Sequence, residues 1–178
     1  MQTKFHKYKK QKGFTLIELM VVISIITFIA SITLVNLDNA ERKARDVRRI
    51  ADMHQLQTAL DLYYDDHGVY PTGDTDTACG GWDTSTADPF LSALVTSGVT
   101  NEVPVDPLNL GTGCGTYAYR YFRYPAGYQN CDASHGAFYV LGINAFESTT
   151  PVATSPGWSC PLRNWSAEFK WVTGKFER

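Results

Sequence analysis

The sequence predicts an α+β protein, in which a long N-terminal helix, membrane-spanning in its first half, packs against a small antiparallel β-sheet head. Three observations support this fold class. Residues 14–37 are mainly apolar, with Glu18 as the one charged residue, and are long enough to cross a bilayer. The next residues, 38–66, contain neither proline nor glycine, the residues that most often end helices. Beyond residue 68, turn-forming residues separate short segments with the period of two that is typical of strands.

Residues 1–13 form a basic leader. They contain five lysines and no acid, whereas the whole chain has a net charge of -2. Lysines here favour a cytoplasmic position for this end of the chain, and the acidic balance of the remainder argues against a nucleic-acid partner. Gly13 precedes the apolar run, whereas a secretory signal places its small-residue cleavage site after it. We therefore expect the leader to be removed and the apolar segment to be retained.

The apolar segment, residues 14–37, is expected to be a transmembrane helix that also serves in assembly. As a helix, Phe14–Val35 would be about 33 Å long, close to the roughly 30 Å of the hydrocarbon core. Glu18 is the acidic residue inside this segment. A charge there costs at least about 2.5–3.5 kcal/mol. Glu18 therefore either pairs with a positive group or extends its carboxylate to the nearby interface.

The segment Lys12–Leu19, KGFTLIEL, resembles the processing site of type IV prepilins and of the pseudopilins of type II secretion. The resemblance implies that a prepilin peptidase cleaves after Gly13 and methylates the new N-terminus at Phe14. It implies a pilin-like fold as well. It also implies an assembly role for Glu18, whose carboxylate would pair with the α-ammonium group of a neighbouring subunit. A Glu18 side chain that only extends to the interface is the alternative.

Residues 38–67 are expected to continue the helix as an amphipathic segment. Apolar residues recur every three or four positions, at Val47, Ile50, Met53, Leu56, Leu60 and Tyr63. Gly68 and Pro71 then provide signals that end a helix. Four arginines lie within about 120° of the helix circumference, at Arg42, Arg45, Arg48 and Arg49. Because acids are interleaved with them, a solvated or subunit-packing face is favoured over binding to lipid headgroups or DNA.

Residues 68–178 are expected to form an exported, β-rich globular head. Residues 73–86 have the composition of a loop. A short helix within residues 88–98 would bury one face, formed by Phe90, Leu91, Leu94 and Val95. Three strands are predicted to follow, at Thr116–Tyr124, Ala137–Ile143 and Ala167–Thr173. An antiparallel sheet of these strands could lie across the apolar stripe of the long helix.

The head is similar, over fewer residues, to that of the major pseudopilin of type II secretion. The similarity rests on Leu56–Pro71 and Val103–Asn109. It would imply a calcium site in a C-terminal loop. Residues Thr150–Ser166, however, contain no carboxylate, and calcium prefers hard oxygen ligands. We therefore expect no calcium site, no other metal site and no cofactor.

The four cysteines all lie in the predicted head. No C-x-x-C occurs among them, which argues against a zinc or redox motif. An exported head occupies a compartment that permits disulfides. Among three connectivities we expect the sequential one, Cys79 with Cys114 and Cys131 with Cys160. Free buried thiols are the alternative.

Catalytic motifs are absent from the sequence: the four histidines are scattered, and no G-x-S-x-G, H-E-x-x-H or P-loop occurs. We therefore expect a structural protein and no enzyme, namely a subunit of a type IV pilus-like filament made as a membrane-held precursor. Within this class, a major pseudopilin of a type II secretion system is the alternative. The alternative of another class is a membrane-anchored extracellular binding head, for adhesion or DNA uptake, that makes contact through Trp82, Trp158 and Trp165.

The resemblance also implies partners and a location. The partners would be further copies of the chain, the prepilin peptidase, a platform membrane protein and an assembly ATPase. The precursor would be a single-pass protein of the cytoplasmic (inner) membrane with an exported C-terminal head. After assembly it would belong to a cell-surface or periplasmic filament.

Overall fold

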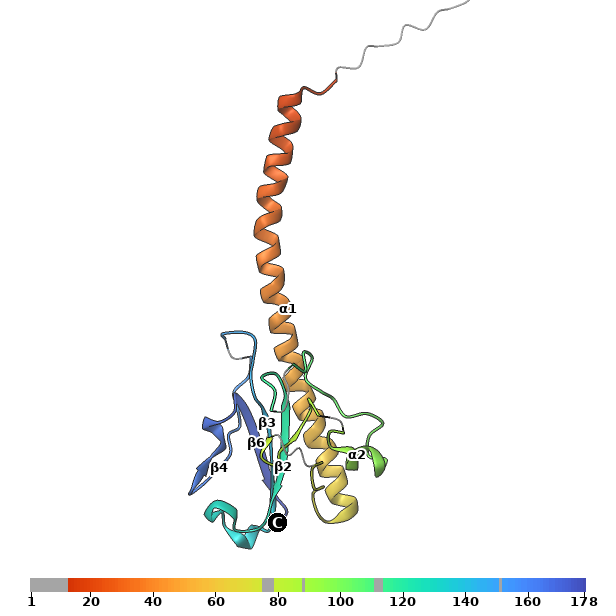
Figure 1. Cartoon of the computed structure of the whole chain (residues 1–178), viewed down its shortest axis with the longest axis vertical. Coiled ribbons are helices and arrows are strands. Elements are labelled where there is room, and N and C mark those ends of the chain that lie inside the picture. Colours follow the sequence, from red (N-terminus) through yellow and green to blue (C-terminus); the bar gives the residue numbers. More distant parts are fainter. Residues whose placement is uncertain (1–12, 75–78, 88, 111–113, 151) are drawn as a thin grey trace, which may run out of the picture. The chain divides into compact units, whose positions relative to one another are not determined.

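The structure, a computed structural model, describes residues 13–74, 79–87, 89–110, 114–150 and 152–178, except for the side chains of residues 32–36. Contacts divide the chain into two units, Met1–Ala40 and Glu41–Arg178. We call the second the head unit. Helix α1 (Leu16–His67) contributes residues to both, and a small antiparallel sheet follows it (Figure 1). The predicted α+β fold class is confirmed.

Helix α1 has 52 residues and ends where the sequence predicts. Gly68 has a φ of 71°, and its N–H donates to the Tyr64 carbonyl at 2.7 Å. A residue with positive φ just after a helix closes its last turn, and glycine adopts that conformation without strain. Over the part of the chain that the structure describes, we find no helix both long and apolar enough to cross a membrane.

The head unit contains a four-stranded antiparallel sheet in the order β1-β2-β3-β6. Its strands are β1 (Asp83–Thr84), β2 (Tyr119–Tyr124), β3 (Phe138–Ile143) and β6 (Trp171–Phe176). A separate hairpin pairs β4 (Ser159–Cys160) with β5 (Arg163–Asn164). Two sequence predictions were wrong here. The segment around β1 was expected to be loop throughout, and the last strand was expected at Ala167–Thr173, where a 3-10 helix (Trp165–Ala167) comes first.

Strand β3 is buried along its whole length because both faces of the sheet are covered. Tyr139, Leu141 and Ile143 point into a first hydrophobic cluster, which contains the apolar stripe of α1. Phe138 and Val140 point into a second cluster on the opposite face, which contains cysteines and aromatic side chains. Because side chains alternate between the two faces along a strand, β3 contributes side chains to both hydrophobic clusters. In Figure 1 the second half of α1 lies alongside β2, β3 and β6.

The predicted apolar faces are largely confirmed, with two errors. Met53, Leu56 and Leu60 on α1 are fully buried, whereas Val47 is 53% exposed. Helix α2 (Ser92–Thr96) lies within the predicted range, but its Val95 is 42% exposed. In each case the error lies at an end of the predicted stripe.

Candidate functional site

Thr15 and Glu18 form reciprocal hydrogen bonds at the start of α1. The Thr15 N–H donates to the Glu18 carboxylate at 2.8 Å, and the Glu18 N–H donates to the Thr15 hydroxyl oxygen at 3.3 Å. The Thr15 hydroxyl also donates to the carboxylate, at 2.7 Å. This arrangement is a capping box, which satisfies two N–H groups that the first turn of a helix leaves without intrahelical partners.

The contact with Thr15 was missed in the sequence analysis, although the T-x-x-E spacing signals it. It gives Glu18 a role within a single chain that needs no neighbour. Glu18 nevertheless remains exposed, so a positive group of another subunit can reach its carboxylate. Its pairing with a neighbouring α-ammonium group stays a prediction.

The predicted cleavage junction lies just before α1. Phe14 is 91% exposed, and a side-chain atom placed on Gly13 would meet no other atom within 4 Å. Both residues precede the first helical residue, Leu16. A peptidase can therefore reach the bond between them without unwinding the helix. Residues 1–12 of the predicted leader lie outside the described residues.

The first part of α1 exposes large apolar side chains around its circumference. Between Leu16 and Ile29 their exposed fractions run from 49% at Val22 to 77% at Leu16. A helix that is apolar on all sides is normally covered by lipid or by other helices. This segment therefore requires a partner that the single chain does not provide.

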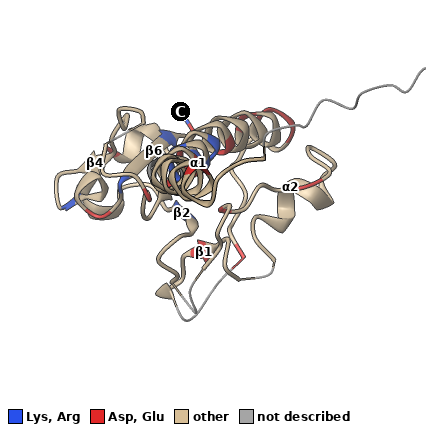
Figure 2. Cartoon of the chain, turned by 90° about the horizontal axis from the view of Figure 1, so that it is seen from above, with Lys and Arg blue, Asp and Glu red and all other residues tan. Residues whose placement is uncertain are grey.

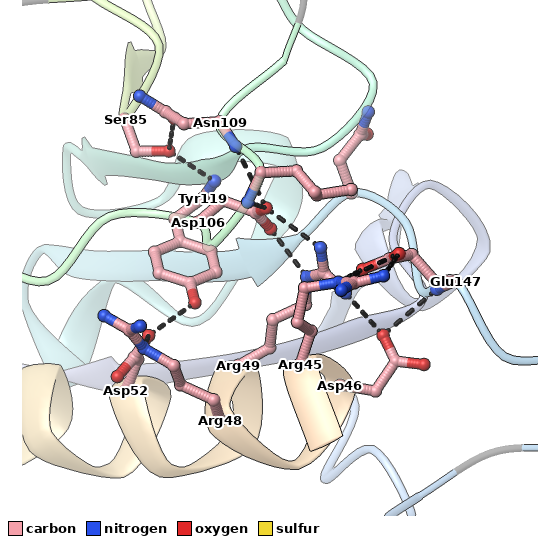
Figure 3. Close-up of polar contacts among 12 residues, drawn as sticks. Arg45, Asp46, Arg48, Arg49, Asp52, Ser85, Asp106, Asn109, Tyr119 and Glu147 are labelled. Carbon is pink, nitrogen blue, oxygen red and sulfur yellow. Dashed lines mark hydrogen bonds and ion pairs between the residues drawn. The ribbon is translucent and has the colours of Figure 1, made fainter. Parts of the chain in front are cut away.

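A buried ion cluster forms the second notable polar feature, and it lies in the head unit (Figure 3). Arg49 is fully buried and binds three carboxylates. Its guanidinium donates to Asp106 at 2.7 and 3.0 Å, to Asp46 at 2.6 Å and to Glu147 at 2.8 Å. Arg45 donates to Glu147 as well, at 2.7 Å. Residues from α1, from the loop before β2 and from the loop after β3 are thereby joined.

Two carboxylates of this cluster, those of Glu147 and Asp46, have lowered pKa values. Hydrogen bonds from Arg45 lower the pKa of Glu147, against the effect of burial. Burial alone would raise the pKa of Asp46, but hydrogen bonds from Ser148 and from the Glu147 N–H outweigh it and lower that pKa. Since donors inside the protein already bind these oxygens, the cluster is a structural link between segments.

The arginine face predicted for α1 is therefore only partly correct. Arg48 is 65% exposed, as a solvated face would require, whereas Arg49 is buried among acids. One turn further on, Asp52 is also buried, and its carboxylate accepts a hydrogen bond from the Tyr119 hydroxyl at 2.7 Å. Burial raises the pKa of Asp52, although the Tyr119 hydroxyl and Arg48 oppose this. The helix stripe that faces the sheet thus changes from apolar to ionic toward its N-terminal end.

The head unit contains two disulfides, Cys79–Cys114 and Cys131–Cys160, which is the sequential pairing. The Cα atoms of the pairs lie 4.8 and 5.0 Å apart. The cysteines of both pairs belong to the second hydrophobic cluster or pack against it. They therefore tie loops across the face of the sheet opposite α1.

The tryptophans proposed for a binding head belong to the same cluster. Trp165 is fully buried, and Trp82 is 8% exposed. Trp158 packs against Phe138 and Phe176, with ring centroids 5.8 and 5.1 Å apart. Trp82 and Trp165 are therefore core residues, and the half-buried Trp158 packs against that core.

Known proteins show matching features at the N-terminus. A family model described as the prokaryotic N-terminal methylation motif matches residues 8–34. That range contains the Gly13–Phe14 junction and Glu18. The match agrees with the exposed junction and the capped helix start described above.

Relatives with longer similarity extend the match into the head unit. Type II secretion system core protein G of Vibrio cholerae serotype O1 is 37% identical over 101 residues, which are 57% of this chain and 68% of the relative. Core protein G of Escherichia coli strain K12 is 36% identical over 102 residues, which are 55% of this chain and 67% of the relative. No solved structure matches the chain significantly. The chain therefore belongs to the pilin and pseudopilin family that includes type II secretion system core protein G.

Proposed function

We propose that this protein is the major structural subunit of a type II secretion pseudopilus, which is a periplasmic filament. The observation that carries the proposal is the similarity to two core protein G relatives over about two thirds of their length. This reverses the order of the sequence-based expectations, in which a type IV pilus subunit came first. The family is one of filament subunits without enzymatic function, and we extend that description to this chain.

The N-terminal geometry supports a defined route of maturation. The prepilin peptidase would remove residues 1–13 and methylate Phe14 at the exposed junction. The precursor would be held in the inner membrane by residues 14–37, with residues 38–67 and the head exported. A platform membrane protein and an ATPase would then move the subunit from the membrane into the filament.

The apolar part of α1 supports bundling in the filament. Its side chains have no cover in the single chain, and copies packed side by side would remove them from water or lipid contact. In such a bundle the surroundings have a low dielectric constant, so an unpaired charge is costly. Glu18 would meet the α-ammonium group of a neighbour there, in addition to its own Thr15.

A binding head is less well supported, because two of the three aromatic side chains on which that alternative depended, Trp82 and Trp165, are buried. A pilus subunit would have the same capped helix and exposed junction, so only the relatives favour the secretion role. We propose that the head needs neither calcium nor another cofactor, because residues 150–166 contain no carboxylate.

The test is deletion of the gene in its own host. We expect enzymes that are normally released to accumulate in the periplasm, while surface pili and attachment persist. Re-expression of the unchanged chain should restore release, and a chain with Gly13 changed to a residue that blocks cleavage should not. Normal release combined with loss of surface pili would refute the secretion role and favour the pilus subunit.

A further inference from the structure

A cavity of about 490 Å³ opens beside helix α2 in the head unit. Its lining is mainly apolar and comes from the loop before α2, from α2 and from residues 101–109. Phe90, which is 7% exposed, forms part of the buried wall. Val95 and Val105 are 42% and 40% exposed, so they lie toward the mouth. The volume falls within the range of roughly 300–1,000 Å³ that is typical of ligand sites with apolar walls.

The polar groups of the lining do not call for a charged ligand. The Ser85 hydroxyl donates to the Asn109 side-chain oxygen at 3.0 Å and accepts from the Tyr119 N–H at 2.9 Å. Among the lining residues that the structure describes, Glu102 is the one with a charge, and it is exposed. An apolar group can therefore enter the cavity without leaving a charge buried and unpaired.

A protruding apolar group lies elsewhere in the head unit, at the turn between β4 and β5. The turn consists of Pro161 and Leu162, which we call the hairpin tip, and both residues are exposed. At 67%, Leu162 is the most exposed large apolar side chain of the head unit that the structure describes. The Leu162 N–H donates to the Gln129 carbonyl at 3.2 Å, and the neighbouring Cys160 is bonded to Cys131. Because these contacts hold the tip in place, it would lose little conformational freedom on binding.

The hairpin tip and the cavity lie far apart on the same head unit. Figure 1 and Figure 2 show strand β4 of the hairpin at one side of the head unit and α2 at the opposite side. The tip therefore cannot reach the cavity of its own chain. When an apolar group fits a pocket elsewhere on an identical molecule, each copy can bind one neighbour through the group and another through the pocket. Such a heterologous contact does not have to close into a ring, and it can form a helical filament.

We propose that the hairpin tip of one subunit inserts into the cavity beside α2 of another copy of this chain. The inference rests on the filament role proposed above, and it adds a contact between head units to the bundling of α1. A cavity of this size holds a drug-sized molecule, so it has room for the side chains of Pro161 and Leu162. Because both surfaces are apolar, salt should weaken the contact little.

Photo-cross-linking of filaments identifies what lies against the hairpin tip. A diazirine analogue of leucine has nearly the size of leucine and can replace it throughout the chain. Filaments are formed from a mixture of isotopically heavy and normal chains, so that a link between copies has a mixed mass. We expect mass spectrometry to find position 162 linked to residues 92–105 of another copy. The proposal would be overturned if other leucines are linked, but position 162 is linked to other segments, to another protein or to nothing.

Substitutions at both surfaces provide the second test. Leu162→Ser removes the apolar side chain of the tip, and Leu162→Met is its matched control because methionine keeps an apolar group of similar volume. Val95→Asp places a charge at the mouth of the cavity, and Val95→Ile is its matched control. Since position 162 is exposed, neither change there should lower the unfolding temperature appreciably.

We expect Leu162→Ser and Val95→Asp each to reduce the yield of sheared filaments about tenfold or more. Leu162→Met and Val95→Ile should stay within about twofold of the unchanged chain. A normal yield from Leu162→Ser would overturn the proposal, as would an equal loss of filaments in Leu162→Met. Absence of filaments from the unchanged chain would instead refute the proposed filament role, and this contact with it.

Discussion

Replacing Arg49 by methionine removes a buried cation while keeping a long side chain. Arg49 and Asp46 are both fully buried, and Asp106 is 2% exposed. The change deprives Asp106 of two hydrogen bonds and Asp46 of one, whereas Glu147 keeps its bonds to Arg45. Two buried carboxylates are then left without the cation that both bind.

The expected loss in the free energy of unfolding is about 3–5 kcal/mol, which is typical when one partner of a buried ion pair is removed. For a domain of this size, that loss lowers the unfolding temperature by about 10–20 °C. The matched control is Arg48→Met, one residue away. Because Arg48 is 65% exposed, we expect its loss to cost at most about 1 kcal/mol.

The destabilisation should depend on pH. In the unchanged protein the folded state lowers the pKa of Asp46 and Glu147. Their contribution to stability is therefore present above the ordinary pKa of a carboxyl group and is lost as the pH falls through the folded-state pKa. In the Arg49→Met protein, protonation relieves the repulsion between carboxylates. The difference in the free energy of unfolding between the unchanged protein and the Arg49→Met protein should therefore become smaller below about pH 4.

The assay is urea unfolding of the processed protein in detergent, followed by circular dichroism at neutral pH and in acid. If Arg49→Met lowers the free energy of unfolding by less than about 1 kcal/mol at neutral pH, the cluster does not stabilise the head as a buried ion pair should. If the free energy of unfolding falls by the same amount at both pH values, the carboxylates do not cause the destabilisation. Either result would refute the reasoning.

Mass spectrometry of the mature protein should find methylated Phe14 at its N-terminus; an intact leader in assembled material would contradict cleavage after Gly13. Glu18→Ala should leave cleavage largely intact and remove one half of the capping box, but it should abolish assembly or its register, so a normal yield of filaments would rule out the pairing role. Removal of the Cys131–Cys160 disulfide should lower the free energy of unfolding by about 3 kcal/mol, as measured by urea unfolding, and four alkylatable thiols in the native protein would rule out both bridges. Chelation of divalent cations should leave the unfolding temperature unchanged, and a marked fall would reveal a calcium site.

The apolar half of α1 and its C-cap were predictable because they depend on local rules. A long, mainly apolar run and a glycine before a proline determine a helix and its end with little help from the rest of the chain. Strand β3 was predictable for the same reason, since its residues are all suited to burial. The capping box was also readable from T-x-x-E, and was missed because the family motif already gave Glu18 another role.

The ion cluster was not predictable from sequence. Arg48 and Arg49 are neighbours with the same side chain, yet one is exposed and the other is buried. The difference depends on Asp106 and Glu147, which lie far away in the sequence, and spacing along a helix contains no information about them. Similarly, the tryptophans were assigned to loops because their segments are rich in glycine, serine and proline. Their burial depends on the second cluster, which forms only when loops cross the outer face of the sheet.

The position of the ion cluster also affects the order in which the head can fold. Strands β2 and β3 are close in sequence, so they can pair after closing a short loop. The cluster instead joins residues 46–49 to residues 106 and 147, and contacts between such distant residues form slowly. Until Glu147 is in place, packing of this end of α1 against the sheet would bury Arg49 and Asp46 without the bonds that both make to residue 147. Attachment of the helix to the sheet is therefore expected as a late step in folding, after most of the head has formed.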